Sequence, residues 1–241
     1  MSTSNLPIIQ GLWVGPRLSS VERLSVCSFL AHGHEYHLYV YDELEGVPAG
    51  TTVKDAREIL PADRIFRRSN SGSYEAFSDF FRYKLLFEKG DFWADLDTIA
   101  LRPFDFPEKI VISSERSNAG CRSVNNGMLK FPAGSPVMET AWRICAAKRV
   151  ETLGQCELGP ELMEWLVNRF DLHGYVQEPE VFCPIHWHRY FDLTAPECFL
   201  PEGAYSVHFW NDALTQQEID KDAQFPPTSL YERLKARYLH T

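Results

Sequence analysis

The stretch Ser78–Pro103, SDFFRYKLLFEKGDFWADLDTIALRP, forms the centre of the predicted fold. Apolar residues at helical spacing predict a helix over Glu75–Lys89, and a glycine follows it, as is common after a helix C-terminus. The apolar run Phe92–Leu101 then predicts a buried strand, and this strand contains Asp95 and Asp97. The stretch therefore combines a central helix with a central strand that carries two carboxylates.

Upstream of this stretch, the sequence predicts a strand, a helix and a second strand. Their ranges are Leu6–Val14, Val21–Leu30 and Tyr36–Tyr41, with Ser19 or Ser20 as the helix cap. Elements in this order favour a βαβ unit and therefore a parallel sheet. We expect an α/β fold.

Further elements are expected on both sides of the central stretch. Helices are predicted over Val53–Leu60, Pro136–Arg149, Glu161–Phe170 and Leu230–Leu239. Strands are predicted over Lys109–Ser113, Met128–Phe131 and Tyr205–Trp210, a polar loop over Ser69–Ser73, and a turn at Asn125-Asn126-Gly127. No linker divides the chain convincingly, so we expect one domain over residues 1–241.

Composition narrows the classes of partner and location. The 241 residues carry a formal net charge of −9, which makes nucleic acid an unfavourable partner, although a bound metal ion can still attract phosphates. None of the six cysteines forms a C-x-x-C pair, so we expect reduced thiols in a cytoplasmic protein. Neither a signal peptide nor a membrane span is visible.

The two aspartates of the central strand suggest a metal site. Alternate residues of a strand share a face, so Asp95 and Asp97 would point the same way. Paired carboxylates suit Mg²⁺ or Mn²⁺, which can clamp the phosphate oxygens of a diphosphate leaving group. Ligands of open α/β sheets also gather at the carboxyl ends of strands. The D-x-D spacing alone is short enough to occur by chance, and the alternative is an exposed strand end or turn.

The central helix offers a second pair of charged groups. Ser78, Asp79 and Arg82 are neighbours at helical spacing. In a binding site, Asp79 would accept hydrogen bonds from sugar hydroxyls and Arg82 would donate to sugar or phosphate oxygens. The alternative is a surface ion pair that contributes a few tenths of a kcal/mol, roughly.

These residues together form a recognisable pattern. S-D-x-x-R-Y-x-x-L-x-x-x-G-(D)-x-W-x-D-x-D resembles the sugar-binding region of glycosyltransferase family 32, which contains a DXD motif and is related to the clostridial glucosylating toxins and the α-1,4-galactosyltransferases. The matching residues are Ser78, Asp79, Arg82, Tyr83, Leu86, Gly90, Trp93, Asp95 and Asp97. The family's early I-x-x-x-W-x-G and late H-x-W-N elements match Ile9, Trp13, Gly15 and His208-Phe209-Trp210-Asn211. One departure is Asp91, which stands where the family usually has a second glycine.

The resemblance implies a GT-A fold, with a Rossmann-like, mostly parallel sheet that binds a nucleotide-sugar and Mn²⁺ or Mg²⁺. It divides the chain into a nucleotide-sugar-binding half, about 1–115, and an acceptor-side and C-terminal extension, about 116–241. The implied metal ligands are Asp95, Asp97 and His208; the implied donor-binding residues are Trp13, Ser78, Asp79, Arg82, Asp95, Trp210 and Asn211; the implied catalytic residues are Asp95, Asp97, Arg82 and Asn126. Trp13 would stack on the nucleobase, and its alternative role is that of a core tryptophan.

The implied activity is a hexosyltransferase that retains anomeric configuration. It would transfer a hexose from a UDP- or GDP-sugar to a saccharide or lipid-linked saccharide in polysaccharide biosynthesis. A sugar-phosphate nucleotidyltransferase is one alternative, but Gln10–Leu18 lacks the glycine-rich, lysine-containing phosphate loop of that class. A non-catalytic nucleotide-sugar-binding module is the other.

Two further segments carry weaker expectations. His186-Trp187-His188 would place two imidazoles on one strand face, for which a structural or acceptor-side role is favoured over metal binding. The basic helix Tyr231–His240 could contact the inner face of a membrane peripherally, but we expect it to pack on the domain.

Overall fold

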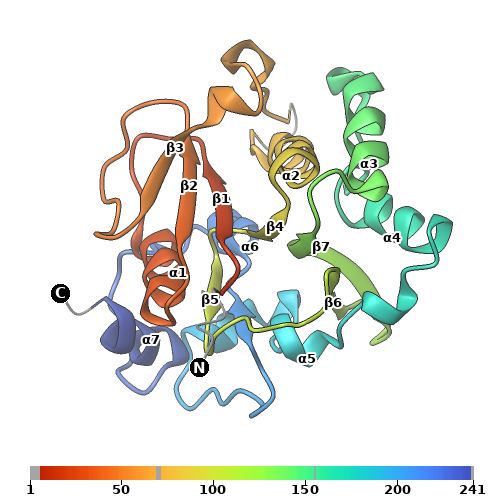
Figure 1. Ribbon diagram of the computed structural model, residues 1–241. Coiled ribbons are helices and arrows are strands. Elements are labelled where there is room, and N and C mark those ends of the chain that lie inside the picture. Colours follow the sequence, from red (N-terminus) through yellow and green to blue (C-terminus); the bar gives the residue numbers. More distant parts are fainter. Residues whose placement is uncertain (1–5, 69–71, 155, 240–241) are drawn as a thin grey trace, which may run out of the picture.

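A six-stranded sheet forms the middle of the molecule in the computed structural model, which describes residues 6–68, 72–154 and 156–239 (Figure 1). The strand order is β3 (Thr52–Asp55), β2 (Tyr36–Val40), β1 (Ile9–Trp13), β4 (Asp91–Ala94), β7 (Arg122–Phe131), β6 (Val111–Arg116). The first four strands run parallel, and β7 is antiparallel to both of its neighbours. The expected α/β fold with a mostly parallel central sheet is confirmed.

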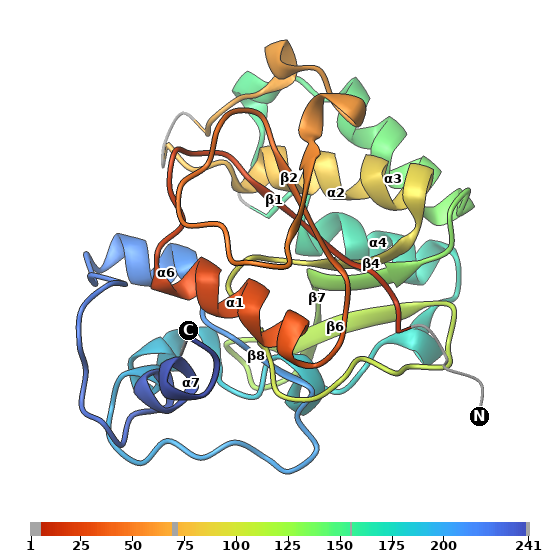
Figure 2. The same cartoon turned by 60° about the vertical axis from the view of Figure 1, so that its left-hand side comes forward.

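Helices cover both faces of this sheet, as Figures 1 and 2 show. On one face lie α2 (Glu75–Lys89), α3 (Pro136–Ala147) and α4 (Pro160–Arg169). On the other lie α1 (Ser20–Ala31), α5 (Pro179–Phe182), α6 (Asn211–Gln216), α7 (Leu230–Tyr238) and a small sheet of β5 (Thr98–Ala100) and β8 (Ser206–His208). Each face has its own apolar core, so the sheet is buried on both sides, as parallel sheets require.

The βαβ unit predicted at the start of the chain is present. The strand β1 pairs in parallel with β2, and α1 connects them. Ser19 caps α1 by accepting a hydrogen bond from the Val21 N–H, and the Glu22 carboxylate accepts from the Ser19 N–H in return. This S-x-x-E capping box satisfies two of the N–H groups that the first helical turn leaves unpaired.

The predicted helix over Val53–Leu60 is wrong. The first part of this segment is the edge strand β3, which pairs with β2, and a short 3₁₀ turn over Ala56–Glu58 follows. Val53 is 48% exposed, as suits an edge strand. The parallel pairing available at the edge of the sheet outweighs the local helical pattern, because a tertiary contact routinely overrides propensity.

The predicted strand over Phe92–Leu101 is two strands in two sheets. The chain leaves the central sheet after Ala94, turns, and enters β5, which pairs with β8. The Thr98 N–H donates to the Asp95 carbonyl across this turn. An apolar run that is buried at both ends looks continuous in the sequence even where the backbone reverses.

The predicted turn at Asn125-Asn126-Gly127 is also wrong. These residues lie inside β7, between β4 and β6, and both asparagines are buried. Asn favours turns because its side chain can hydrogen-bond the nearby backbone, and Gly because it adopts turn conformations without a steric cost. Here the neighbouring strands supply the backbone partners, and the amides bond other side chains. The predicted Ser69–Ser73 loop lies mostly outside the described residues.

Gly90 allows the sharp passage from α2 into β4. Its φ of 69° and ψ of −158° differ from the left-handed helical cap that the sequence suggests. A Cβ at this position would lie 2.4 Å from the Ala133 backbone nitrogen, so only glycine fits. Asp91, the departure from the family pattern, also has a positive φ of 72°, and its carboxylate accepts a hydrogen bond from the Ile8 N–H at 2.9 Å.

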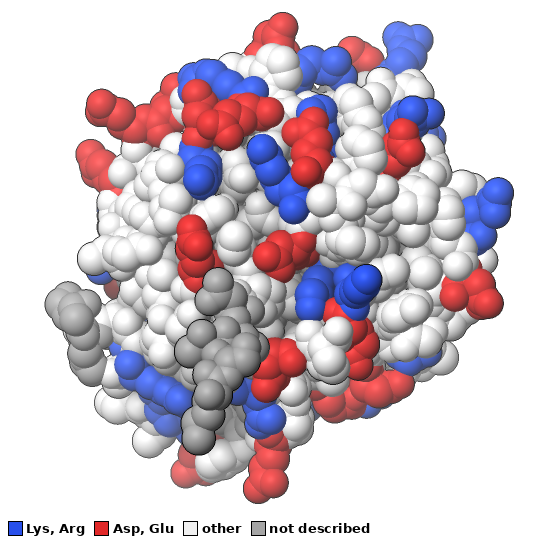
Figure 3. All heavy atoms as spheres, viewed as in Figure 1, with Lys and Arg blue, Asp and Glu red and all other residues white. Residues whose placement is uncertain are grey.

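Charged side chains are interspersed on the face of the molecule seen in Figure 3. Acidic and basic groups alternate there, and this face shows no extended basic area of the kind that nucleic acid requires. All six cysteines are free thiols, as expected.

The turn after β4 rests on Gly11 of β1. A Cβ on Gly11 would lie 2.5 Å from the Leu96 Cδ1 and 2.7 Å from the Tyr36 hydroxyl, both of which are packed against β1. The missing side chain therefore lets the aspartate-bearing turn approach the sheet.

We predict that Gly11→Ala destabilises the fold by about 1–3 kcal/mol, because the added methyl group overpacks this contact. The matched control is Gly203→Ala, since no atom lies within 4 Å of a Cβ there. Urea unfolding of both variants checks the prediction. Equal unfolding midpoints for the two variants would contradict it.

Candidate metal centre and binding crevice

Asp95 and Asp97 lie in the turn between β4 and β5, not on one strand. The Asp95 N–H donates to the Gly127 carbonyl at 2.9 Å, so the turn remains attached to β7 as it leaves the sheet. Strand alternation is therefore the wrong reason for the two carboxylates to converge. They converge because the chain reverses between them.

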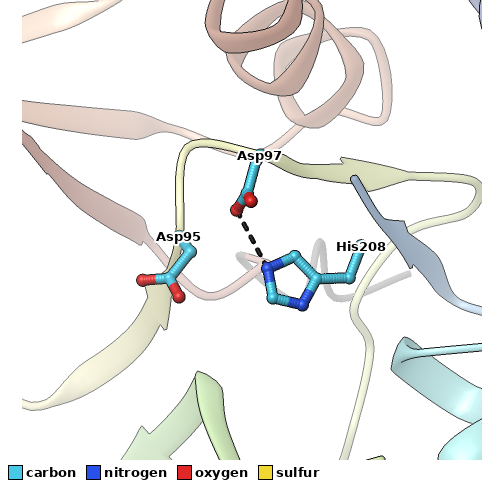
Figure 4. Close-up of side chains that lie close together, drawn as sticks. All are labelled: Asp95, Asp97 and His208. Atoms are coloured by element: carbon cyan, nitrogen blue, oxygen red, sulfur yellow. Dashed lines mark hydrogen bonds and ion pairs between the residues drawn. The ribbon is translucent and has the colours of Figure 1, made fainter. Parts of the chain in front are cut away.

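His208 joins the two aspartates from a distant part of the chain (Figure 4). It ends β8, directly opposite Thr98 of β5 in the antiparallel pair. One ligand atom from each of Asp95, Asp97 and His208 lies within 4.8 Å of the other two. Carboxylate and imidazole donors fit a divalent cation such as Mn²⁺ or Mg²⁺, so the predicted ligand set is brought together.

Asp97 is held by His208 and by the backbone that follows it. Its carboxylate lies 3.0 Å from the His208 Nε2 and accepts a hydrogen bond from the Asn211 N–H at 2.7 Å. Burial acts to lower the pKa of His208, but the Asp97 charge, the hydrogen bond to Asp97 and the contact with Cys183 together hold that pKa well above its usual value. Burial opposes ionisation of Asp97 as well, yet the His208 charge and these hydrogen bonds keep its pKa below the usual value.

Arg82 links the helix α2 to this turn. Its guanidinium lies 3.2 Å from the Asp79 carboxylate and 3.0 Å from that of Asp95. It also donates to the Asn126 carbonyl at 2.6 Å and to the Ser78 hydroxyl at 3.2 Å. Only 4% of the Arg82 and 5% of the Asp79 side chain is exposed, so the surface ion pair considered above is wrong.

Asn126 belongs to the same buried network. Its amide donates to the Asp79 carboxylate at 2.7 Å and lies 3.2 Å from the Tyr83 hydroxyl. Burial raises the pKa of Asp79 to about 6, although Arg82 and Asn126 both oppose this shift. The predicted residues of α2 and of β7 are therefore brought together with Asp95.

The metal group lies beside the point where the strand order reverses. The chain runs outward from β1 to β2 and β3, and then returns to place β4 on the other side of β1. Trp13 ends β1, and Asp95 follows β4. In open α/β sheets, this position between the carboxyl ends of the strands is where ligands bind.

Trp13 lies at the boundary between the core and the surface. It packs partly against the apolar core and remains half-buried at the end of β1. Its indole N–H is buried and has no partner among the described residues. The Lys221 ammonium lies 5.8 Å from its ring centroid.

Trp210 and Asn211 adjoin the metal ligands in different ways. The Trp210 ring lies 4.1 Å from the His208 ring, and its indole N–H donates to the Ile185 carbonyl. Asn211 donates its backbone N–H to Asp97. Its side chain instead bonds Glu22 and Lys221.

Three acidic residues near the site were not found from the sequence. Glu22 is completely buried and pairs with Lys221 at 2.6 Å; its place in the capping box was the available signal. Burial and the charges of Asp97 and Asp95 raise the pKa of Asp212, in the first turn of α6. Glu115, at the end of β6, has a pKa raised by burial. The sequence carries no signal for the last two.

His186 and His188 lie outside the metal group. They flank the start of a 3₁₀ helix over Trp187–Leu193 and not a strand, so the expected shared strand face is wrong. Their rings are stacked at 3.7 Å, and the His186 Nε2 lies 3.2 Å from the Ser117 carbonyl.

No family model matches the chain, and no curated protein does. Several solved structures with similar folds are glycosyltransferases. The PaToxG glycosyltransferase is 16% identical over 68% of this chain and 70% of that chain, with a TM-score of 0.49. The WbbM bifunctional glycosyltransferase is 10% identical over 98% of this chain and 52% of that one, with a TM-score of 0.44. The catalytic domain of alpha-toxin from Clostridium novyi is 9% identical over 99% and 81%, with a TM-score of 0.41. Likeness at this distance concerns the fold and assigns no family.

No helix in the described part of the chain has both the length and the apolar character needed to cross a membrane.

We predict that Asp97→Asn weakens Mn²⁺ binding about tenfold or more, because the amide lacks the charge of the carboxylate. Isothermal titration calorimetry with MnCl₂ measures this. Asp192→Asn is the control, since Asp192 pairs with Arg189 and lies outside the metal group. A wild-type protein that binds no Mn²⁺ would contradict the metal site.

The Asp97–His208 pair also predicts a pH dependence in the absence of metal. A histidine with a raised pKa in the folded state contributes stability below its unfolded pKa, about 6.5, and loses it as pH rises through the folded value. We expect the free energy of unfolding lost in His208→Gln to be largest near about pH 6 and to shrink toward about pH 9.

Urea unfolding of wild type and variant in EDTA measures this difference at each pH. His173→Gln, an exposed substitution, is the control. A loss in His208→Gln that stays constant across the pH range would show that the imidazole is not charged in the metal-free fold.

Proposed function

We propose that this chain is a metal-dependent hexosyltransferase of class EC 2.4, which moves a hexose from a UDP- or GDP-sugar to a saccharide. One observation carries the proposal. At a single strand-order reversal, the fold joins the Asp95–Asp97–His208 group to the buried Asp79–Arg82 pair. A metal group next to a carboxylate that can accept hydroxyl hydrogens suits a diphosphate-linked sugar.

The donor would lie at the carboxyl ends of β1 and β4. When bound, the divalent ion neutralises charge that develops on the departing diphosphate. Trp13, half-buried at the end of β1, offers an aromatic face to the nucleobase. Asp79 offers an acceptor to the sugar hydroxyls, and Ser78 lies one residue before it on α2.

Arg82 has a different role from direct sugar binding. Its N–H groups are directed at protein acceptors on Asp79, Asp95, Asn126 and Ser78. It therefore positions the two carboxylates and supplies a buried positive charge close to the diphosphate. Asn126 fixes Asp79 from the other side. Trp210 and the backbone of Asn211 hold His208 and Asp97.

The acceptor belongs to the proposal as well. A saccharide, including a lipid-linked one used in polysaccharide biosynthesis, would approach from the half of the chain after about residue 115. Retention of configuration follows from the family resemblance, and proton NMR of the released sugar tests it. A peripheral membrane contact through α7 would use its exposed basic side, because Leu230, Tyr231 and Leu234 are buried against the domain.

The deciding experiment is a donor panel. The protein is incubated with Mn²⁺ and a set of UDP- and GDP-sugars, and release of UDP or GDP is measured. Pyrophosphate formed from UTP or GTP and a sugar phosphate would identify a nucleotidyltransferase instead. Donor binding without release on any saccharide would identify a binding module.

We predict that wild type hydrolyses one donor slowly and that Asp79→Asn lowers kcat/KM for it by about 10-fold to 100-fold. The variant loses the charge that accepts sugar hydroxyls, and a charged hydrogen bond contributes about 1.5–3 kcal/mol. Mn²⁺ binding remains, since Asp79 is outside the metal group. Asp63→Asn, an exposed change, is the control. Unchanged kcat/KM in Asp79→Asn would remove Asp79 from the donor site.

A further inference from the structure

Glu115 is a half-buried carboxylate at the end of β6 that has no cationic partner among the described residues. The nearby arginines of β6 and β7 form ion pairs with other residues: Arg116 with Glu180 and Arg122 with Glu178. An unpaired carboxylate in a partly dry position destabilises a fold, because burial penalises its charge. Such a group is a candidate for a functional role.

Asn125 holds this carboxylate in place. Its amide NH₂ donates to the Glu115 Oε2 at 2.7 Å, and its carbonyl Oδ1 accepts from the Gly127 N–H at 2.7 Å. The second bond fixes which end of the amide faces Glu115. One carboxylate oxygen is thereby oriented, and no described residue donates a hydrogen bond to the other, Oε1.

Gly127 connects this pair to the metal group. A Cβ at Gly127 would lie 2.9 Å from the Asn125 Oδ1, 3.0 Å from the Asp95 Oδ2 and 3.5 Å from the His208 Cε1. The Asn125 amide, Asp95 and His208 therefore surround the space that the missing side chain leaves. The charges of His208 and His186 also act on Glu115, although burial dominates and raises its pKa.

Neighbouring asparagines of β7 hold Glu115 and Asp79. Asn126 bonds Asp79 of α2, and Asn125 bonds Glu115 of β6. The register of β7 with β6 shifts at this place, so the strand is irregular where the two amides diverge. The site thus has two carboxylates held by β7, and the proposed donor sugar uses only one.

We propose that Glu115 takes the proton of the attacking hydroxyl on the acceptor side of the site. The inference rests on the proposed glycosyl transfer. The hydroxyl oxygen bonds the anomeric carbon, the bond from that carbon to the phosphate oxygen breaks with its electron pair leaving on the diphosphate, and the hydroxyl proton passes to Glu115. The stereochemical outcome depends on the face of attack: a hydroxyl that attacks opposite the departing diphosphate inverts the anomeric carbon, and one that attacks from the same face retains its configuration.

The test uses donor hydrolysis, in which water is the acceptor. The donor is the UDP-sugar that the donor panel identifies. UDP release from it is measured for wild type, Glu115→Gln and Glu115→Ala, each with Mn²⁺ and with or without sodium azide. Azide replaces water as the nucleophile and has no proton to lose, so it needs no base; the product is a glycosyl azide, which mass spectrometry detects. The control is Glu178→Gln, an exposed carboxylate whose partner Arg122 also bonds the Val176 carbonyl.

We expect turnover to fall about 100-fold or more in both Glu115 variants, as loss of a general base does, while the Kd for UDP with Mn²⁺ stays within about twofold. Azide restores turnover in Glu115→Ala with glycosyl azide as product, and the thermal midpoint of Glu115→Gln equals or exceeds that of wild type, because a buried charge is removed. Glu178→Gln behaves as wild type.

Wild-type turnover in Glu115→Gln would overturn the proposal. A loss of turnover that azide does not restore would also overturn it, and would assign Glu115 a structural role. Both results leave the transferase function standing, since wild type still turns the donor over. A wild type that binds and hydrolyses no donor would instead overturn the proposed function, and this inference with it.

Discussion

The buried guanidinium of Arg82 is the contact on which the site depends. It balances two carboxylates, Asp79 from α2 and Asp95 from the turn after β4, and it also bonds the Asn126 carbonyl of β7. Removing one member of such a buried ion pair costs about 3–5 kcal/mol, because the remaining charge is left without a partner. This one side chain therefore contacts the helix, the turn and the strand together, and the Asn126–Asp79 and Asp95–Gly127 hydrogen bonds support the same arrangement.

Two further ion pairs hold the C-terminal part of the chain next to the metal group. Asp97 and His208 form one buried pair, and Glu22 and Lys221 form another, with Asn211 touching both through its backbone and side chain. These contacts join β8 and the start of α6 to the N-terminus of α1. Residues about two hundred positions apart thus share one network, and the metal group is completed only when both ends of the chain are folded.

Two neighbouring asparagines of β7 serve different carboxylates. Asn126 supports Asp79 of α2, and Asn125 supports Glu115 of β6. Glycine at 127 leaves room for Asp95 and His208 to approach the strand. Consecutive polar residues in the middle of a buried strand are costly in themselves, and here each amide bonds a carboxylate.

The sequence by itself determined the α/β class, the first βαβ unit, the exact span of the central helix and the identity of the Asp95, Asp97 and His208 group, because helical periodicity and a long ordered motif are local properties. Only the tertiary structure decided that the D-x-D segment is a turn between two sheets and that Asn125-Asn126-Gly127 lies within a strand. It also decided that Asn211 serves the site through its backbone and that Asn125, which holds Glu115, lies close to Asp95 and His208 around Gly127. Those features depend on which strands pair and which side chains meet across them, and no local spacing in the chain encodes that pairing.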